Sequence, residues 1–230
     1  GRGRSNQRPR SMMGKAKKPQ VSGTVMHGSA MKGDGMIRDM DLDFAEKYRP
    51  LLGRYASLRD ALTNVHSESN PYQTVIDMIT HMGNGKARLF FIGNGGSAAV
   101  ASHCAIDYMK NGGFATFGPG DAAQMSCLGN DLGFQSVYSL PIERHGQLGD
   151  LLFAISSSGM SEDILDAVDT AKRKMMNVVT LSGFGEGNFL RSKGQVNFYV
   201  PSNQYGTVEI SHLAILHSIL DEVIEIERQK

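Results

Sequence analysis

The chain has 230 residues, of which 40% are hydrophobic, and its formal net charge is +1 at pH 7. This length and apolar content are enough for one well-packed core. The charge is unevenly spread, because residues 1–40 hold nine Lys/Arg and two Asp, whereas the rest of the chain holds 15 basic and 21 acidic side chains. A mildly acidic body argues against a nucleic-acid-binding surface on the folded part.

Cysteine use and hydropathy exclude two further classes of protein. Cys104 and Cys127 are the only cysteines and do not form a CxxC pair, so a disulfide framework is not expected and a reducing cytoplasm fits. No apolar run approaches the length of a membrane span, and the N-terminus lacks a signal-peptide core. We therefore expect a soluble, cytoplasmic protein with no membrane partner.

Residues 1–40 form a basic segment rich in Gly, Ser, Lys, Arg and Met, without hydrophobic periodicity. Such a composition cannot offset the entropy of ordering, so we expect disorder. The segment is either a basic tail or non-native sequence upstream of a true start at one of its methionines. We assign it no function.

Residues 41–85 are expected to form N-terminal helices. The first helix carries a heptad-like apolar stripe with spacings of four, three, four and three, made of Leu51, Tyr55, Leu58, Leu62 and Val65. A narrow stripe of this kind favours packing against another helix, for example from a second subunit. The alternative is that the helix docks on its own domain.

A second helix is expected after the break at Ser69-Asn70-Pro71, and the glycines of residues 83–85 should end it. Its inward-facing positions are predicted to be Val75, Ile76, Ile79 and Met82.

Residues 86–230 are expected to form one domain, organised around the stretch ARLFFIGNGGSAAVASHCAIDYMK. Residues 88–92 are a short, nearly unbroken apolar run that predicts a buried strand, and the glycine-rich turn of residues 93–96 follows. Ser97 is predicted to be the N-cap of an alanine-rich helix. The glycines would let the backbone approach a ligand at the positive end of that helix.

The same alternation continues to the C-terminus. Further strands are predicted at residues 151–155, 177–181 and 195–200. Further helices are predicted at residues 121–128, 134–145, 162–175 and 207–228. Polar loops are predicted at residues 129–133, 156–161 and 183–187, and Pro141 should bend or split its helix. This order predicts an α/β fold, with a parallel sheet flanked by helices and ligands at the carboxyl ends of the strands.

The serine-rich loop of residues 156–161 offers four hydroxyl groups at the start of a helix. Hydroxyls and backbone N–H groups in this setting suit a phosphate monoester. The alternative is an ordinary turn with a cap. The glycine loop, GNGGS, lacks the G-x-G-x-x-G register, so a dinucleotide site is not favoured.

Two pairs of side chains have the spacing of a metal or acid-base site. His103 and Asp107 lie four residues apart on one helical face, and Glu209 and His217 lie eight residues apart, about 80° around a helix. Two histidines with two carboxylates suit zinc or another first-row divalent ion. The alternative is that such histidines are hydrogen-bonded core residues. The chain also contains His66, His81, His145 and His212.

Several motifs together resemble one family. FIGNGGSAAVASH, LGNDLGF, GDLLFAISSSGMSEDI, VVTLSG and the segment from Glu209 to His217, in this order and spacing, resemble the sugar isomerase (SIS) domain. The likeness is to the sedoheptulose 7-phosphate isomerase (phosphoheptose isomerase) family and extends from about Leu51 to the C-terminus. It implies a flavodoxin-like SIS fold, a homotetramer with N-terminal helices in its core, and one divalent metal ion per subunit, most simply Zn²⁺.

The resemblance also implies roles for individual residues. It assigns substrate contacts to Asn94, Gly95, Gly96, Ser97, Asp107, Asn130, Asp131, Ser156, Ser157, Ser158, Ser161 and Glu209. It assigns the metal to His103, Asp107, Glu209 and His217, and the catalytic acid-base work to Asp107 and His217.

Three positions depart from the family pattern. Asp107 stands where the family usually has a Glu, so the carboxylate is drawn back by one methylene. Glu209 replaces a Gln ligand and adds a charge that a metal ion would favour. Asn111 replaces an Arg and removes a cation near the ligand.

The resemblance implies that the chain interconverts sedoheptulose 7-phosphate and D-glycero-D-manno-heptose 7-phosphate through an enediol. There are two alternatives to this function. A related SIS protein binds the bacterial replication initiator as a non-catalytic module, but it lacks the acidic residue and the second histidine, whereas Asp107 and His217 are present here. A sugar-phosphate sensor would need only the binding loops.

Overall fold

The computed structural model describes residues 70–82 and 87–229. The predicted tail, the heptad-like helix and the glycines expected to end the second helix lie outside the described residues. Within the described ranges, no helix combines the length and the apolar character needed to cross a membrane.

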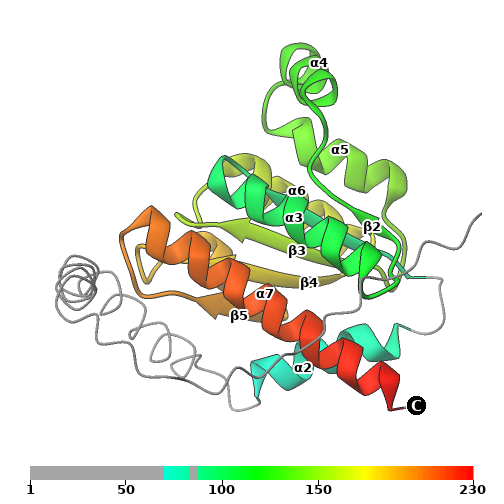
Figure 1. Ribbon diagram of the computed structural model, residues 1–230. Coiled ribbons are helices and arrows are strands. Elements are labelled where there is room, and N and C mark those ends of the chain that lie inside the picture. The colour runs from blue at the N-terminus through cyan, green and yellow to red at the C-terminus, as the bar shows by residue number, and fades with distance from the viewer. Residues whose placement is uncertain (1–69, 83–86, 230) are drawn as a thin grey trace, which may run out of the picture. The chain divides into compact units, whose positions relative to one another are not determined.

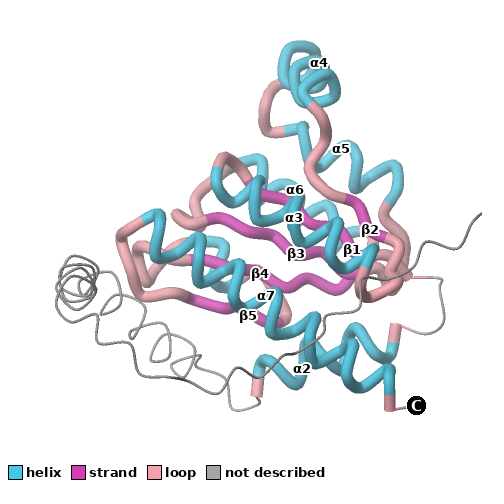
Figure 2. Tube along the Cα trace, in the orientation of Figure 1, coloured by secondary structure: helices cyan, strands magenta, loops and turns pink. Residues whose placement is uncertain are grey.

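A parallel sheet forms the centre of the described part of the chain (Figures 1 and 2). Its strands are β1 (Leu89–Gly93), β2 (Thr116–Phe117), β3 (Leu151–Ser156), β4 (Asn177–Ser182) and β5 (Val196–Tyr199). They lie in the order β2-β1-β3-β4-β5, which is the flavodoxin-like order of a doubly wound sheet. The predicted fold class is confirmed.

Helices cover both faces of this sheet. The helices of the described part are α2 (Pro71–His81), α3 (Gly96–Lys110), α4 (Ala122–Leu132), α5 (Ser136–His145), α6 (Glu162–Arg173) and α7 (Tyr205–Arg228), with a short 3₁₀ helix, η1 (Phe189–Ser192). Of these, α4 stands apart from the sheet and contacts α5. One apolar cluster joins α2, α3 and α7 to the sheet, and a second joins α5 and α6 to its other face. In Figure 1, α3 and α7 run side by side in front of the strands.

The strand residues alternate between the two clusters. Phe91 and Phe153 are fully buried and stack with ring centroids 4.9 Å apart in the cluster beneath α3 and α7. Phe90 and Leu152 point into the opposite cluster. Because both faces are covered, β1 and β3 are buried at every position, which explains their continuous apolar sequences.

Three sequence predictions about the elements need correction or addition. The predicted loop of residues 129–133 is wrong, because α4 continues through Leu132 and ends where Gly133 takes a positive φ of 87°. A glycine inside a helix costs only about 1 kcal/mol, so Gly129 did not end it. Pro141 lies within α5 without splitting it. Strand β2 was missed, since it has two residues and neither is fully buried.

A buried ion pair joins the beginnings of β1 and β3. The side chain of Asp150 is 1% exposed and lies 2.8 Å from Nη2 of Arg88. The same carboxylate accepts hydrogen bonds from the backbone N–H groups of Arg88 and Gln147, at 2.8 and 2.9 Å. This one carboxylate therefore fixes two chain segments at the amino-terminal edge of the sheet.

Removing this carboxylate should destabilise the fold much more than removing a surface one. Asp150→Ala leaves the Arg88 guanidinium and two backbone N–H groups without their partner, so we expect a loss of about 3 kcal/mol in the free energy of unfolding. The matched control is Asp169→Ala, which removes a 2.6 Å pair with Lys193 at the surface and should cost less than about 1 kcal/mol. Urea unfolding measures both, and equal losses would contradict this account.

Candidate functional site

The glycine loop after β1 requires glycine at two places. Gly95 is the N-cap of α3 with φ 55° and ψ −122°, which an L side chain rarely adopts. A Cβ on Gly93 would lie 2.6 Å from the carbonyl oxygen of Ser97. The prediction that Ser97 caps the helix is wrong, because the chain already enters α3 at Gly96, and Ser97 is buried in its first turn.

The serine loop follows β3 and leads into α6. The Ser156 hydroxyl accepts a hydrogen bond from the backbone N–H of Gly159 at 3.1 Å, and Gly159 has a φ of 64°. The hydroxyl of Ser157 is buried and has no hydrogen-bond partner within the described ranges. A buried, unpaired hydroxyl is costly unless a ligand or water satisfies it.

The two loops line one polar cavity of about 250 Å³. They meet because β1 and β3 are paired neighbours, with Gly93 opposite Ile155, so both loops leave the same carboxyl edge of the sheet. The lining consists of Asn94, Gly95, Gly96, Ser97, Ser156, Ser157, Ser158, Ser161, Tyr205 and Glu209. The residues predicted to contact the substrate in the glycine loop and in the serine loop are thus brought together.

Further along α3, two histidines and a carboxylate converge. The Nε2 atoms of His103 and His217 are 3.2 Å apart, and Oδ2 of Asp107 lies 3.3 Å from His103 Nε2 and 3.8 Å from His217 Nδ1. Donor atoms around a tetrahedral zinc ion, with bonds of about 2.0–2.2 Å, lie about 3.3–3.6 Å from one another. The donor types fit such an ion, and one donor atom from each residue lies within 4.8 Å of the other two, which is somewhat wider than this ideal.

A buried hydrogen bond between α3 and α7 fixes this group. Tyr108, the neighbour of Asp107, donates its hydroxyl to the backbone carbonyl of Leu216, the neighbour of His217, at 2.8 Å. Burial raises the pKa of Tyr108 well above its usual value, so the hydroxyl keeps its proton. Burial, together with the charge of Asp107, also raises the pKa of Cys104 to about 12, so at neutral pH this thiol keeps its proton.

Glu209, Asn130 and Asp131 do not join the group formed by His103, Asp107 and His217. The carboxylate of Glu209 lies in the polar cavity, so close to Gly96 that a Cβ there would be 2.3 Å from it. Asn130 and Asp131 lie on the exposed helix α4, bonded to each other at 2.8 Å, and do not line the cavity. Their predicted roles stay predictions.

His212 is a core residue, as the alternative interpretation of isolated histidines would have it. It is 0% exposed, and its Nε2 lies 3.1 Å from the carbonyl oxygen of Ser182. Burial lowers the pKa of His212 to about 4. His81 and His145 are exposed and lie outside the group formed by His103, Asp107 and His217.

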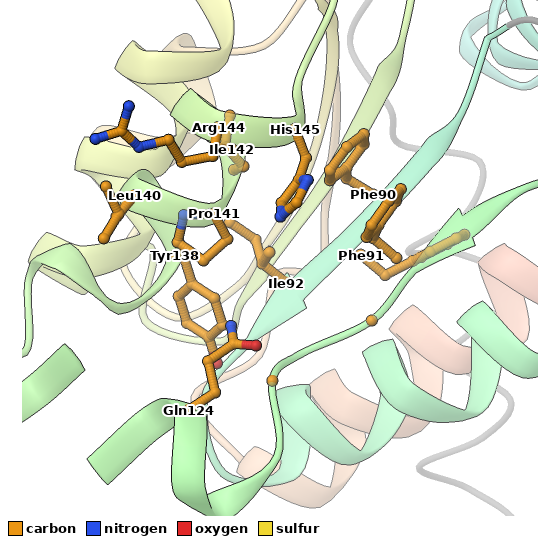
Figure 3. A pocket seen from close by; sticks show the side chains of 13 residues that line it. Phe90, Phe91, Ile92, Gln124, Tyr138, Leu140, Pro141, Ile142, Arg144 and His145 are labelled. Atoms are coloured by element: carbon orange, nitrogen blue, oxygen red, sulfur yellow. The ribbon is translucent and has the colours of Figure 1, made fainter. Parts of the chain in front are cut away.

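A separate cavity of about 320 Å³ lies between β1 and helices α4 and α5 (Figure 3). In Figure 3, the rings of Phe90 and His145 lie on one side and Tyr138 and Gln124 on the other. No carboxylate is among its lining residues. It shares no lining residue with the polar cavity.

Sequence analysis missed Tyr205 as a residue of the polar cavity. A signal was present, because Tyr205 lies four residues before Glu209 and hence on the same face of α7. Its ring packs edge-on against Phe184 at 4.8 Å, which holds it beside the cavity.

Comparisons with known proteins agree with this geometry. Residues 55–183 match the SIS domain. The phosphoheptose isomerase of Azoarcus sp. is 32% identical over 179 residues, which are 73% of this chain and 89% of that protein. The chain belongs to the phosphoheptose isomerase family of SIS-domain proteins. Another member, from Haemophilus ducreyi, is 38% identical over 145 residues, covering 60% of this chain and 73% of that protein.

Solved structures agree with the family assignment. The phosphoheptose isomerase GmhA from Neisseria gonorrhoeae aligns with a TM-score of 0.64 and 27% identity, covering 81% of this chain and 97% of that chain. A phosphoheptose isomerase from Francisella tularensis has a TM-score of 0.69 and 24% identity, covering 80% and 98%, and supports the fold.

The buried His212 should make stability fall in acid. Its folded pKa of about 4 lies below the ordinary histidine value of 6.5, so between these pH values the unfolded chain binds a proton that the folded chain does not. The stabilisation is complete above pH 6.5 and is lost as the pH falls toward 4, by up to about 3 kcal/mol. Urea unfolding at a series of pH values should show a shallower slope for His212→Gln, with His81→Gln following the parent protein. An unchanged slope in His212→Gln would refute the assignment.

Proposed function

We propose that this chain interconverts sedoheptulose 7-phosphate and D-glycero-D-manno-heptose 7-phosphate, as the names of its relatives indicate. The observation that carries the proposal is that one helix, α3, contributes to both parts of the site. Its first turn lines the polar cavity, and its middle carries His103 and Asp107. An anion cradle and an acid-base group therefore lie at fixed separation on one rigid element.

The separation suits an extended sugar phosphate. Ser97 and His103 are six residues apart on α3, which is about 9 Å along a helix. An extended heptose chain has a comparable length, so the phosphate can occupy the cavity while the other end of the sugar lies beside His103, whose Nε2 is 3.3 Å from Oδ2 of Asp107.

The serine loop would hold the phosphate. It offers the hydroxyls of Ser156, Ser157, Ser158 and Ser161 next to the beginning of α6. The positive end of a helix favours an anion, and phosphate oxygens would satisfy the buried hydroxyl of Ser157.

Asp107 and His217 would move the protons. Asp107 takes a proton from one of the carbons C1 and C2 and returns it to the other through an enediol, while His217 transfers a proton between the two oxygens. Oδ2 of Asp107 faces the histidines, so Oδ1 would be the oxygen that takes the proton from the substrate. A divalent ion, most simply Zn²⁺, held by His103, Asp107 and His217, would polarise the sugar oxygens. Glu209 lies in the neighbouring polar cavity, so its role as a further ligand stays a prediction from the resemblance.

We further propose that the enzyme is a cytoplasmic homotetramer whose N-terminal helices contribute to assembly, and that its product enters heptose biosynthesis. The non-catalytic alternatives, an initiator-binding module or a sensor, need neither Asp107 nor His217. The convergence of both with His103 favours the enzyme.

The acid-base role predicts a graded response at position 107. Asp107→Asn keeps the shape but cannot accept the proton, so kcat should fall by about 10³-fold. Asp107→Glu restores the side chain common in the family and should keep most of the activity. NMR of the sugar anomeric region measures the rates, with Asp77→Asn on α2 as a control for charge. Full activity in Asp107→Asn would contradict the assignment.

The metal role predicts a loss of zinc affinity. His103→Ala removes one donor of the convergent group and should lower zinc affinity at least about 100-fold. Metal analysis after dialysis against a weak chelator measures the retained zinc per chain. His81→Ala removes an exposed histidine outside the group and should retain the parent content. Equal zinc in both variants would refute the site.

A further inference from the structure

Asp163 is a buried carboxylate that the proposed chemistry does not use. It lies in the first turn of α6, directly after the serine loop, and is 4% exposed. Across residues 70–82 and 87–229, no ion pair joins it to a basic side chain. Its two oxygens instead accept hydrogen bonds from Nδ2 of Asn94, at 3.0 and 2.8 Å.

This arrangement is a poor source of stability. Burial raises the pKa of Asp163, and the hydrogen bonds from Asn94 and from the backbone N–H groups of Ile164 and Asp163 oppose this effect only in part. A carboxylate removed from water without a cation costs free energy that a neutral isostere would not. Its effect on the orientation of the Asn94 side chain offers a reason for its presence.

Asp163 determines which end of the Asn94 amide is free. Because the carboxylate can only accept hydrogen bonds, it holds the Asn94 nitrogen. The Oδ1 atom takes part in none of the hydrogen bonds among the described residues, and Asn94 lines the polar cavity. Oδ1 is therefore the atom with which Asn94 meets a ligand, and an oxygen acceptor suits a hydroxyl group and repels a phosphate oxygen.

A second contact fixes the same segment. Tyr138, which is 4% exposed, donates its hydroxyl to the carbonyl oxygen of Gly93, the residue before Asn94. Figure 3 shows Tyr138 in the wall of the separate cavity beside β1. Hydrogen bonds thus fix both the backbone of Gly93 and the side chain of Asn94, so Asn94 is already oriented before a ligand binds.

We propose that Asp163 is a positioning residue, which orients Asn94 so that its Oδ1 accepts a hydrogen bond from a hydroxyl of the sugar phosphate. The proposal rests on the proposed function, since it assumes a sugar phosphate in the polar cavity. In this proposal Asn94 recognises a sugar hydroxyl, and the serine loop recognises the phosphate.

The test is a double-mutant cycle with two ligands. Asp163→Asn frees the Asn94 amide to turn, so calorimetry should show about a tenfold weaker Kd for sedoheptulose 7-phosphate, which corresponds to one lost hydrogen bond. The Kd for inorganic phosphate should change less than about twofold. In an Asn94→Ala background, Asp163→Asn should have no further effect on sugar-phosphate binding.

Stability and a matched control complete the design. The Tm of Asp163→Asn should equal or exceed that of the parent protein, and Asp166→Asn, an exposed carboxylate on the same helix, should change neither Kd. Equal losses for both ligands, or an undiminished effect in the Asn94→Ala background, would overturn the inference. Parent protein that binds sedoheptulose 7-phosphate without converting it would refute the proposed function and leave this test intact, and parent protein that does not bind it would overturn both.

Discussion

The hydrogen bond from Tyr108 to the carbonyl of Leu216 is the contact on which the site depends most directly. It joins α3 to α7 inside the core, one residue away from Asp107 on one helix and from His217 on the other. The Tyr108 ring packs edge-on against Phe91 of β1 at 5.1 Å. Helices α3 and α7, which carry His103, Asp107 and His217, are therefore positioned by the same buried cluster that packs against the sheet. A rigid scaffold fixes the geometry of an exposed site in this way.

The carboxyl edge of the sheet concentrates features that do not favour stability. Among the described residues, the buried hydroxyl of Ser157 has no hydrogen-bond partner and the buried carboxylate of Asp163 has no cation beside it. Gly95 has a backbone conformation that disfavours any side chain. The opposite edge contains Asp150, whose charge and hydrogen bonds are matched by Arg88 and Gln147. This contrast is expected where function and stability are served by different ends of one sheet.

Much of this arrangement could be predicted from sequence, and the exceptions have physical causes. The apolar runs at β1, β3 and β4 and the spacing of His103 and Asp107 are local signals, so they identified the strands and the helical face correctly. The end of α4 depends on Gly133 and not on Gly129, which composition does not distinguish. The pairing of Asp163 with Asn94 spans 69 residues and depends on the contact of two loops, so no local pattern reports it.

The central claim is that Asp107 moves a proton between two carbons of a seven-carbon sugar phosphate. The measurement that tests it most directly is NMR of sedoheptulose 7-phosphate incubated with the zinc-loaded protein in deuterated water. The account predicts new aldose signals with deuterium at C2, and loss of the reaction on adding a chelator. A folded, zinc-loaded protein that leaves the ketose unchanged and undeuterated would contradict it.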